Sequence, residues 1–214
     1  TRLVLKADLV AVTMEKYVNT LEEKYKANNV IMIPHGTFEI PTESDYSVPE
    51  GPLKVMTFGK FGTYKKVESL IEAIDVIRKN KNMEVELIIA GTDNPNVEGY
   101  LEGVKAKYSH IPNVTYTGYV DEKDVPTLFQ ESAVVVFPYT STTGSSGVLH
   151  QAGSYGKAVV LPDLGDLSTL IKDEGYRGEI FNPNSTIELA MAIGKILENE
   201  QYRKELGKTN YQAA

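Results

Sequence analysis

Short apolar runs alternate with amphipathic helical patterns along most of the chain. The runs that predict strands are, in chain order, 9–12, 30–33, 54–58, 85–90, 114–117, 133–137, 158–161 and 179–181. Patterns with helical spacing lie between most of them, at 14–25, 66–79, 97–108, 122–131, 148–155, 167–173 and 186–198. The clearest helix places Val67, Leu70, Ile71, Ile74 and Ile77 three and four positions apart, so that they share one face.

The strand patterns also indicate how the strands pair. Most are rich in Val and Ile and lack polar alternation, which is typical of strands that are buried on both faces. Alternating β and α segments favour a parallel sheet with right-handed crossovers. We therefore predict an α/β fold, a Rossmann-like parallel sheet with helices on both faces.

A linker interrupts the pattern early in the chain. Residues 37–52 contain three prolines and several acidic residues but no hydrophobic periodicity. The roughly 36 residues before it form one strand–helix–strand unit, which is too small to fold alone. We predict that residues 1–48 are the remnant of an amino-terminal domain plus the interdomain linker, and that residues 49–214 form the main domain.

Composition narrows the classes of protein. The 214 residues are 42% hydrophobic and 24% charged, as in ordinary soluble globular proteins. Cysteine is absent, which excludes disulfides and thiolate metal sites and favours a cytoplasmic location. No apolar run approaches the roughly 18 residues of a membrane-spanning helix. The net charge of −7 argues against a nucleic-acid partner, and the three histidines lack metal-ligand spacing.

The segment 137–162 is the most informative part of the sequence. A strand pattern ends at Pro138, a loop of Thr, Ser and Gly follows, and an amphipathic pattern begins near Gly147. A helix that starts there presents unpaired N–H groups and the positive end of its dipole, which together attract anions such as phosphate. The next strand follows directly, so the loop lies at the carboxyl edge of the sheet, where open α/β sheets bind ligands. The alternative is a Ser/Gly capping loop.

Three further motifs follow predicted strands. In Phe58–Lys66, glycines allow close approach to a ligand, and Lys60 and Lys65 could contact a diphosphate; the alternative is an ordinary turn with solvated lysines. Residues 88–94 and 114–120 could line a nucleotide pocket or form simple turns. We interpret His150 as a residue on a helix surface.

In this order, these motifs resemble the carboxyl-terminal domain of GT-B-fold retaining glycosyltransferases of the group 1, family 4 type. Residues 7–13 are similar to the family's "ADxVIAVS" strand, and 30–36 are similar to its "VIPHGVD" run into the interdomain linker. Phe58-Gly59-Lys60 with Lys65 resembles its diphosphate clamp, with Lys60 in place of the usual arginine. Residues 153–160 are similar to "AMAxGxPVV".

The resemblance implies a two-domain enzyme that transfers a sugar from a nucleoside-diphosphate sugar to an acceptor, with retention of configuration and no cofactor or obligatory metal. The carboxyl-terminal domain binds the donor, and the missing amino-terminal domain binds the acceptor. Family motifs assign the diphosphate to Gly59, Lys60 and Lys65, the phosphate and sugar to Thr143, Gly144, Ser145, Ser146, Gly147 and Val148, the ribose to Gln151, and the base to Gly118, Tyr119 and Val120.

The chain departs from the family at two of these positions. Thr143 and Gln151 stand where the family usually has two glutamates, and Thr169 stands where a third is common. The departures leave two hypotheses, an atypical active subgroup or a degenerate, non-catalytic scaffold or binding module. Half of a sugar-nucleotide epimerase is a third.

The resemblance has consequences for the isolated chain as well. Because it lacks nearly all of the acceptor domain, we expect no transfer by these 214 residues alone. The parent protein could still attach to the inner face of a membrane through the missing domain. The sequence leaves the donor sugar, the base and the acceptor open.

Overall fold

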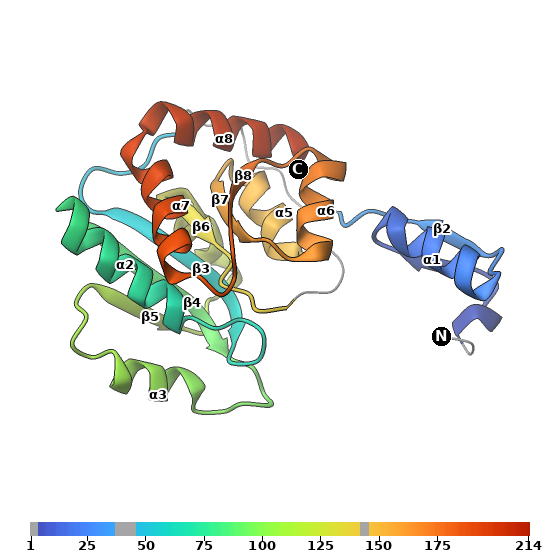
Figure 1. The fold of residues 1–214 in the computed structure, drawn as a ribbon, viewed down its shortest axis with the longest axis horizontal. Coiled ribbons are helices and arrows are strands. Elements are labelled where there is room, and N and C mark those ends of the chain that lie inside the picture. Colours follow the sequence, from blue (N-terminus) through green and yellow to red (C-terminus); the bar gives the residue numbers. More distant parts are fainter. Residues whose placement is uncertain (1–3, 37–45, 142–145) are drawn as a thin grey trace.

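A computed structural model describes residues 4–36, 46–141 and 146–214. In Figure 1 a small amino-terminal unit projects from a larger α/β body. The unit contains η1 (Val4–Lys6), β1 (Val10–Val12), α1 (Glu15–Tyr25) and β2 (Val30–Met32). Its two strands are parallel, and its core is a cluster of three buried valines, Val10, Val18 and Val30.

The larger body is built on one six-stranded parallel sheet, in the order β5-β4-β3-β6-β7-β8 (Figure 1). The strands are β3 (Leu53–Phe61), β4 (Val85–Asp93), β5 (Val114–Gly118), β6 (Ser132–Val136), β7 (Ala158–Pro162) and β8 (Gly178–Phe181). The chain runs outward from β3 to β5 and then returns to β6, on the other side of β3. This reversal creates a crevice at the carboxyl ends of β3 and β6, where such sheets bind ligands.

Helices cover both faces of the sheet, as the strand patterns predict. The helical elements of the body are α2 (Glu68–Lys81), α3 (Tyr100–Lys107), η2 (Glu122–Asp124), α4 (Val125–Glu131), α5 (Gly147–Ser154), α6 (Gly165–Glu174), α7 (Thr186–Glu198) and α8 (Glu200–Ala213). Residues of α2, α3 and α7 share one buried cluster with the sheet, and residues of α4, α5 and α6 share another. Along β6, Val134 and Val136 join the first cluster and Val135 joins the second, so this strand is buried on both faces.

Two strands are longer than their sequence patterns predict. β3 continues to Phe61 and β4 to Asp93, with Gly59 and Gly91 paired in register. A Cβ on Gly91 would lie 1.9 Å from the Gly59 carbonyl oxygen, so only glycine lets the two strands approach here. Placing Gly59 and Lys60 in the loop after the strand was therefore wrong, because both residues lie within β3.

The amino-terminal unit contacts the body through a few side chains. Met14 is buried in the cluster formed with α4, α5 and α6, while Lys16 and Tyr17 both bond the Asp166 carboxylate on α6. The domain boundary near residue 48 stays a prediction. In the described parts of the chain, no helix has both the length and the apolar character needed to cross a membrane.

Candidate functional site

Lys65 lies buried in the loop that joins β3 to α2. Lys65 is 9% exposed, and its backbone forms a β-bridge with Tyr139, which follows β6. The ammonium nitrogen lies 4.8 Å from the centroid of the Tyr139 ring and 5.9 Å from that of Tyr64. No residue in the described ranges forms a hydrogen bond or an ion pair with it. Burial lowers the pKa of Lys65 to about 8. A buried cation without a counter-ion is costly, so it is typical of a site that binds an anion.

The backbone of β3 makes room for this ammonium group. A Cβ at Gly59 would lie 2.6 Å from the Lys65 nitrogen, so glycine is the residue that fits beside it. Gly59 also has a φ of +135°, which is strained for any other residue. Lys60, in contrast, is exposed near the end of β3. The structure thus brings Gly59 and Lys65 together but leaves Lys60 at the surface.

A chain of contacts connects Lys65 with the start of α5. The buried Tyr139 hydroxyl is hydrogen-bonded to the side chain of Ser146, the residue before Gly147. The first N–H groups of α5 have no partners within the helix and carry the positive end of its dipole. Buried Lys65 and this helix end therefore form one electropositive region. The predicted residues Thr143, Gly144 and Ser145 lie outside the described residues.

A cavity of about 400 Å³ runs along α5. Its lining includes Gly147 and Gln151 of α5 and Tyr155 just past the helix, and also Glu122 of the segment that precedes α4. His35 and Gly36, at the end of the amino-terminal unit, line it as well. Gln151, predicted to contact a ribose, thus faces a cavity next to the end of α5 where we expect an anion.

The three predicted base contacts lie near this cavity in sequence but are not part of its lining. Gly118 ends β5 with a φ of +68°, and Val120 packs against the apolar cluster below. The side chain of Tyr119 is 79% exposed. Glu122, two residues beyond Val120, does line the cavity, although no sequence motif marks it.

His150 is buried, so our interpretation of it as a helix-surface residue was wrong. It is 4% exposed, and its ring stacks on His35 at 4.6 Å between centroids and 7° between planes. Its Nδ1 is hydrogen-bonded to the Tyr176 hydroxyl at 2.9 Å, and its Nε2 lies 3.5 Å from a Glu174 carboxylate oxygen. Burial and the neighbouring His35 lower the pKa of His150 to about 4, so the ring is neutral at pH 7.

No sequence signal distinguished these buried side chains from exposed ones. His150 is buried because His35 and Tyr176, from segments far away in the sequence, pack against its ring, and the spacing within α5 does not reveal those contacts. Tyr139 was visible in the sequence only as part of the loop after a strand. Among the residues that the structure describes, no group of three or more His, Asp or Glu side chains is placed to hold a metal ion.

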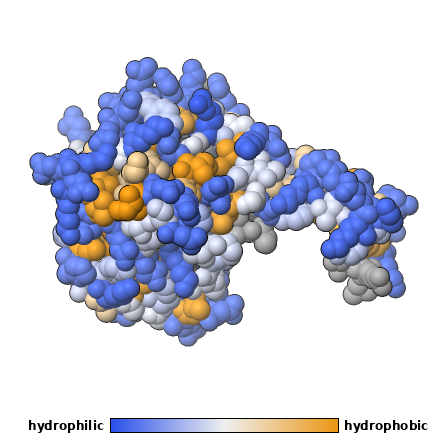
Figure 2. Space-filling view, viewed as in Figure 1, coloured by the Kyte–Doolittle hydropathy of each residue, from blue (hydrophilic) through white to orange (hydrophobic). Residues whose placement is uncertain are grey.

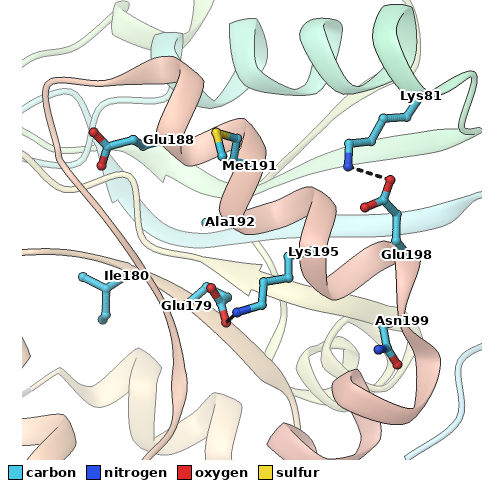
Figure 3. A pocket seen from close by; sticks show the side chains of 9 residues that line it. All are labelled: Lys81, Glu179, Ile180, Glu188, Met191, Ala192, Lys195, Glu198 and Asn199. Carbon is cyan, nitrogen blue, oxygen red and sulfur yellow. Dashed lines mark hydrogen bonds and ion pairs between the residues drawn. The ribbon is translucent and has the colours of Figure 1, made fainter.

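A second cavity, of about 660 Å³, lies on another part of the surface, between α7, β8 and the end of α2. Its lysines are already paired, Lys81 with Glu198 at 2.6 Å and Lys195 with Glu179 at 2.8 Å (Figure 3). Apolar side chains gather on the face that carries α7 in Figure 2, and Met191 there is 66% exposed. With both of its lysines neutralised, this cavity is a poorer candidate for a diphosphate.

Comparison with known proteins identifies the family. The family model described as "Glycosyl transferases group 1" matches residues 41–213. The chain belongs to this family. Its parallel sheet flanked by helices matches solved GT-B glycosyltransferase structures, so the predicted fold class and family resemblance are confirmed.

Curated relatives and solved structures of this glycosyltransferase family align with most of the chain. An uncharacterized glycosyltransferase of Methanocaldococcus jannaschii is 27% identical over 95% of this chain and 53% of its own length. D-rhamnosyltransferase WbpZ of Pseudomonas aeruginosa is 24% identical over 74% of this chain and 39% of its own. The structure of Anabaena HepE in complex with UDP has a TM-score of 0.80 at 19% identity, covering 99% of this chain and 60% of that protein. The chain thus spans about half the length of the curated relatives that it matches.

Proposed function

We propose that residues 49–214 bind the nucleoside-diphosphate sugar donor of a retaining glycosyltransferase. The observation that carries the proposal is the buried ammonium group of Lys65, which has no counter-ion among the described residues and is linked through Tyr139 and Ser146 to the amino end of α5. A diphosphate at this place would supply the missing negative charge. Gly59 would let the donor approach β3 closely, and Gln151 would bond the ribose hydroxyls.

These groups also suit the chemistry of transfer. When the bond from the sugar to the diphosphate breaks, negative charge develops on the departing diphosphate oxygen. Lys65 and the N–H groups of Gly147 and Val148 would stabilise that charge most strongly in the transition state, which is what accelerates the step. In this proposal, fixed positive groups of the protein stabilise the departing diphosphate, a role for which other transferases use a metal ion. The exposed Lys60 adds a further positive charge near the diphosphate.

Support for a second domain comes from the amino-terminal unit. Leu9, Ile31 and Ile33 are 56%, 39% and 51% exposed, an apolar surface that a larger sheet and its helices would cover. The curated relatives are about twice as long as this chain. We therefore infer that an amino-terminal domain supplies the acceptor site, and that the 214 residues alone do not transfer sugar.

Calorimetric titration of the 214-residue chain with UDP and with GDP tests the donor site. We expect at least one nucleotide to bind with micromolar to millimolar affinity, and Lys65→Met to weaken that binding by about tenfold or more, since a hydrogen bond from a charged group is lost. The neighbouring Lys66 is exposed, so Lys66→Met is the matched control and should change affinity less than twofold.

The same titration distinguishes the proposed donor site from a scaffold. If the folded chain binds neither nucleotide, the degenerate, non-catalytic module becomes the better reading. Equal loss of affinity in Lys65→Met and Lys66→Met would instead show that the nucleotide is held by general surface charge and not by the buried ammonium group.

A further inference from the structure

The position of the cavity along α5 predicts how a bound donor would be oriented. It begins at Gly147, where the amino end of the helix would hold a phosphate, and it continues to Tyr155 just past the last turn. At 1.5 Å per residue, this stretch is about 12 Å long, which is enough for a nucleoside lying along the helix. A donor anchored by its diphosphate beside Lys65 would thus place its ribose near Gln151 and its base further along the cavity. The inference below rests on this proposed function.

Among the described residues, the lining of this cavity carries a single carboxylate. It belongs to Glu122, which lines the cavity together with Gln151 of α5. In the described part of the chain the Glu122 carboxylate forms no hydrogen bond or ion pair, while the neighbouring Lys123 ammonium lies 4.0 Å from the Asp121 carboxylate. No lysine or arginine of the described ranges lines the cavity, and His150 is neutral because burial lowers its pKa to about 4. The Glu122 carboxylate accepts hydrogen bonds and cannot donate them.

We propose that Glu122 reads the base of the donor and selects guanine. Guanine presents N1–H and the N2 amino group side by side, two donors that match the two oxygens of a carboxylate. Uracil presents one N–H between two carbonyl oxygens, and both would be repelled by the same carboxylate. Adenine and cytosine each place a ring acceptor beside their amino group. Only guanine offers an uninterrupted pair of donors, so the cavity is built for a guanosine diphosphate sugar.

The competing role for Glu122 is to bond the ribose hydroxyls. That role would compensate for the neutral amide of Gln151, but it would not discriminate between bases, because the ribose is common to all donors. The two roles thus predict different effects of the same substitution. On the ribose, loss of the charge weakens every nucleotide alike. On the base, loss of the charge weakens only the guanine nucleotide.

Calorimetric titration of the 214-residue chain with GDP, UDP and ADP distinguishes them. We expect GDP to bind about tenfold more tightly than UDP or ADP, since a site that hydrogen-bonds one ligand rejects analogues that leave its polar group unpaired. Glu122→Gln keeps the shape of the side chain and should remove most of this preference, weakening GDP about tenfold and UDP less than twofold. Glu102→Gln, an exposed glutamate on α3, is the matched control and should change neither.

Other results of these titrations would overturn the assignment of Glu122, the donor site, or both. UDP binding as tightly as GDP, or Glu122→Gln weakening both equally, would overturn the assignment of Glu122 to guanine while leaving the donor site intact. Binding of neither nucleotide would overturn the donor site and this inference together. Glu122 is exposed, so its replacement does not endanger the fold, and circular dichroism of the variant verifies this.

Discussion

Lys65 carries its charge in a place that is unfavourable for folding. Its ammonium group has lost most of its hydration, and what it gains from the described residues is contact with the faces of two aromatic rings. Contacts of this type contribute about 0.5–2 kcal/mol, which is less than full hydration provides. A methionine of similar length would fill the space without that penalty. The lysine is therefore better explained by what it binds than by what it stabilises.

The titration of Lys65 predicts how nucleotide binding depends on pH. Burial lowers the pKa of Lys65 to about 8, so the group is charged at pH 7 and increasingly neutral above pH 8. A bound diphosphate favours the charged form and raises this pKa, so binding takes up a proton around pH 8–9. We expect affinity for the nucleotide to fall as the pH rises from 7 to 9, measured by calorimetry in buffers of different ionisation enthalpy.

Lys65→Met provides the control for this pH dependence. Its remaining, weaker binding should change little across the same range. A wild-type affinity that stays constant between pH 7 and 9 would show that Lys65 does not contact the ligand.

Gly91 matters through the close approach of two strands. Its φ of +133° is strained for other residues, and a Cβ there would meet the Gly59 carbonyl. We expect Gly91→Ala to destabilise the protein by about 2–4 kcal/mol, since backbone must move to relieve the clash. Gly103→Ala on α3 is the control; a Cβ there meets nothing within 4 Å, and alanine favours a helix. Urea unfolding measures both, and equal stabilities would contradict the clash.

At the scale of elements, α8 illustrates how a buried polar side chain joins segments. Asn210 is fully buried, accepts a hydrogen bond from the Arg177 N–H at 2.7 Å and donates one to the Lys157 carbonyl at 2.8 Å. These two backbone groups lie just before β8 and β7. One amide thus fixes the position of α8 against the ends of two strands, and α8 in turn packs on α5.

Asn210→Ala should therefore destabilise the packing of α8 against the ends of β7 and β8. It leaves a partly buried N–H of Arg177 and the buried carbonyl of Lys157 without partners, and we expect a loss of about 2–4 kcal/mol in the free energy of unfolding. Gln212→Ala, an exposed amide on the same helix, should stay within about 0.5 kcal/mol of the wild type. Denaturant unfolding compares the two, and similar values would show that water replaces the Asn210 hydrogen bonds without cost.

For the whole molecule, the body depends little on the amino-terminal unit. Contacts between them involve Met14, Lys16, Tyr17 and His35, whereas the body has two apolar clusters of its own. The core of the unit is three valines, too few to keep 36 residues folded. The two parts should thus differ sharply in independent stability.

A chain that begins at residue 46 tests this difference. We expect it to unfold cooperatively with a melting temperature less than about 10 °C below that of the 214-residue chain, because the loss is mainly the burial of Met14 and a few polar contacts. A peptide of residues 1–36 should be unfolded by circular dichroism. A truncated body without a cooperative transition would show that the unit is part of its fold.

The sequence by itself determined the fold class and the order of the elements. Strand and helix periods are local properties, so the apolar runs predicted each of the eight strands that the structure describes, and the pattern at 186–198 matched α7 residue for residue. Spacing also identified the loop before α5 and Lys65 as candidate binding residues. Their roles in binding a donor stay predictions.

Only the tertiary structure decided which of these groups meet. Lys60 and Lys65 look equivalent in the sequence, yet one is exposed and the other is buried beside Tyr139, 74 residues further along the chain. Glu122 and Gln151 face the same cavity because the strand order returns the chain to β3, and His150 is buried because His35 and Tyr176 pack against its ring. The burial of a side chain depends on the distant segments that pack against it. Hydrophobic periodicity within one segment does not predict which segments these are.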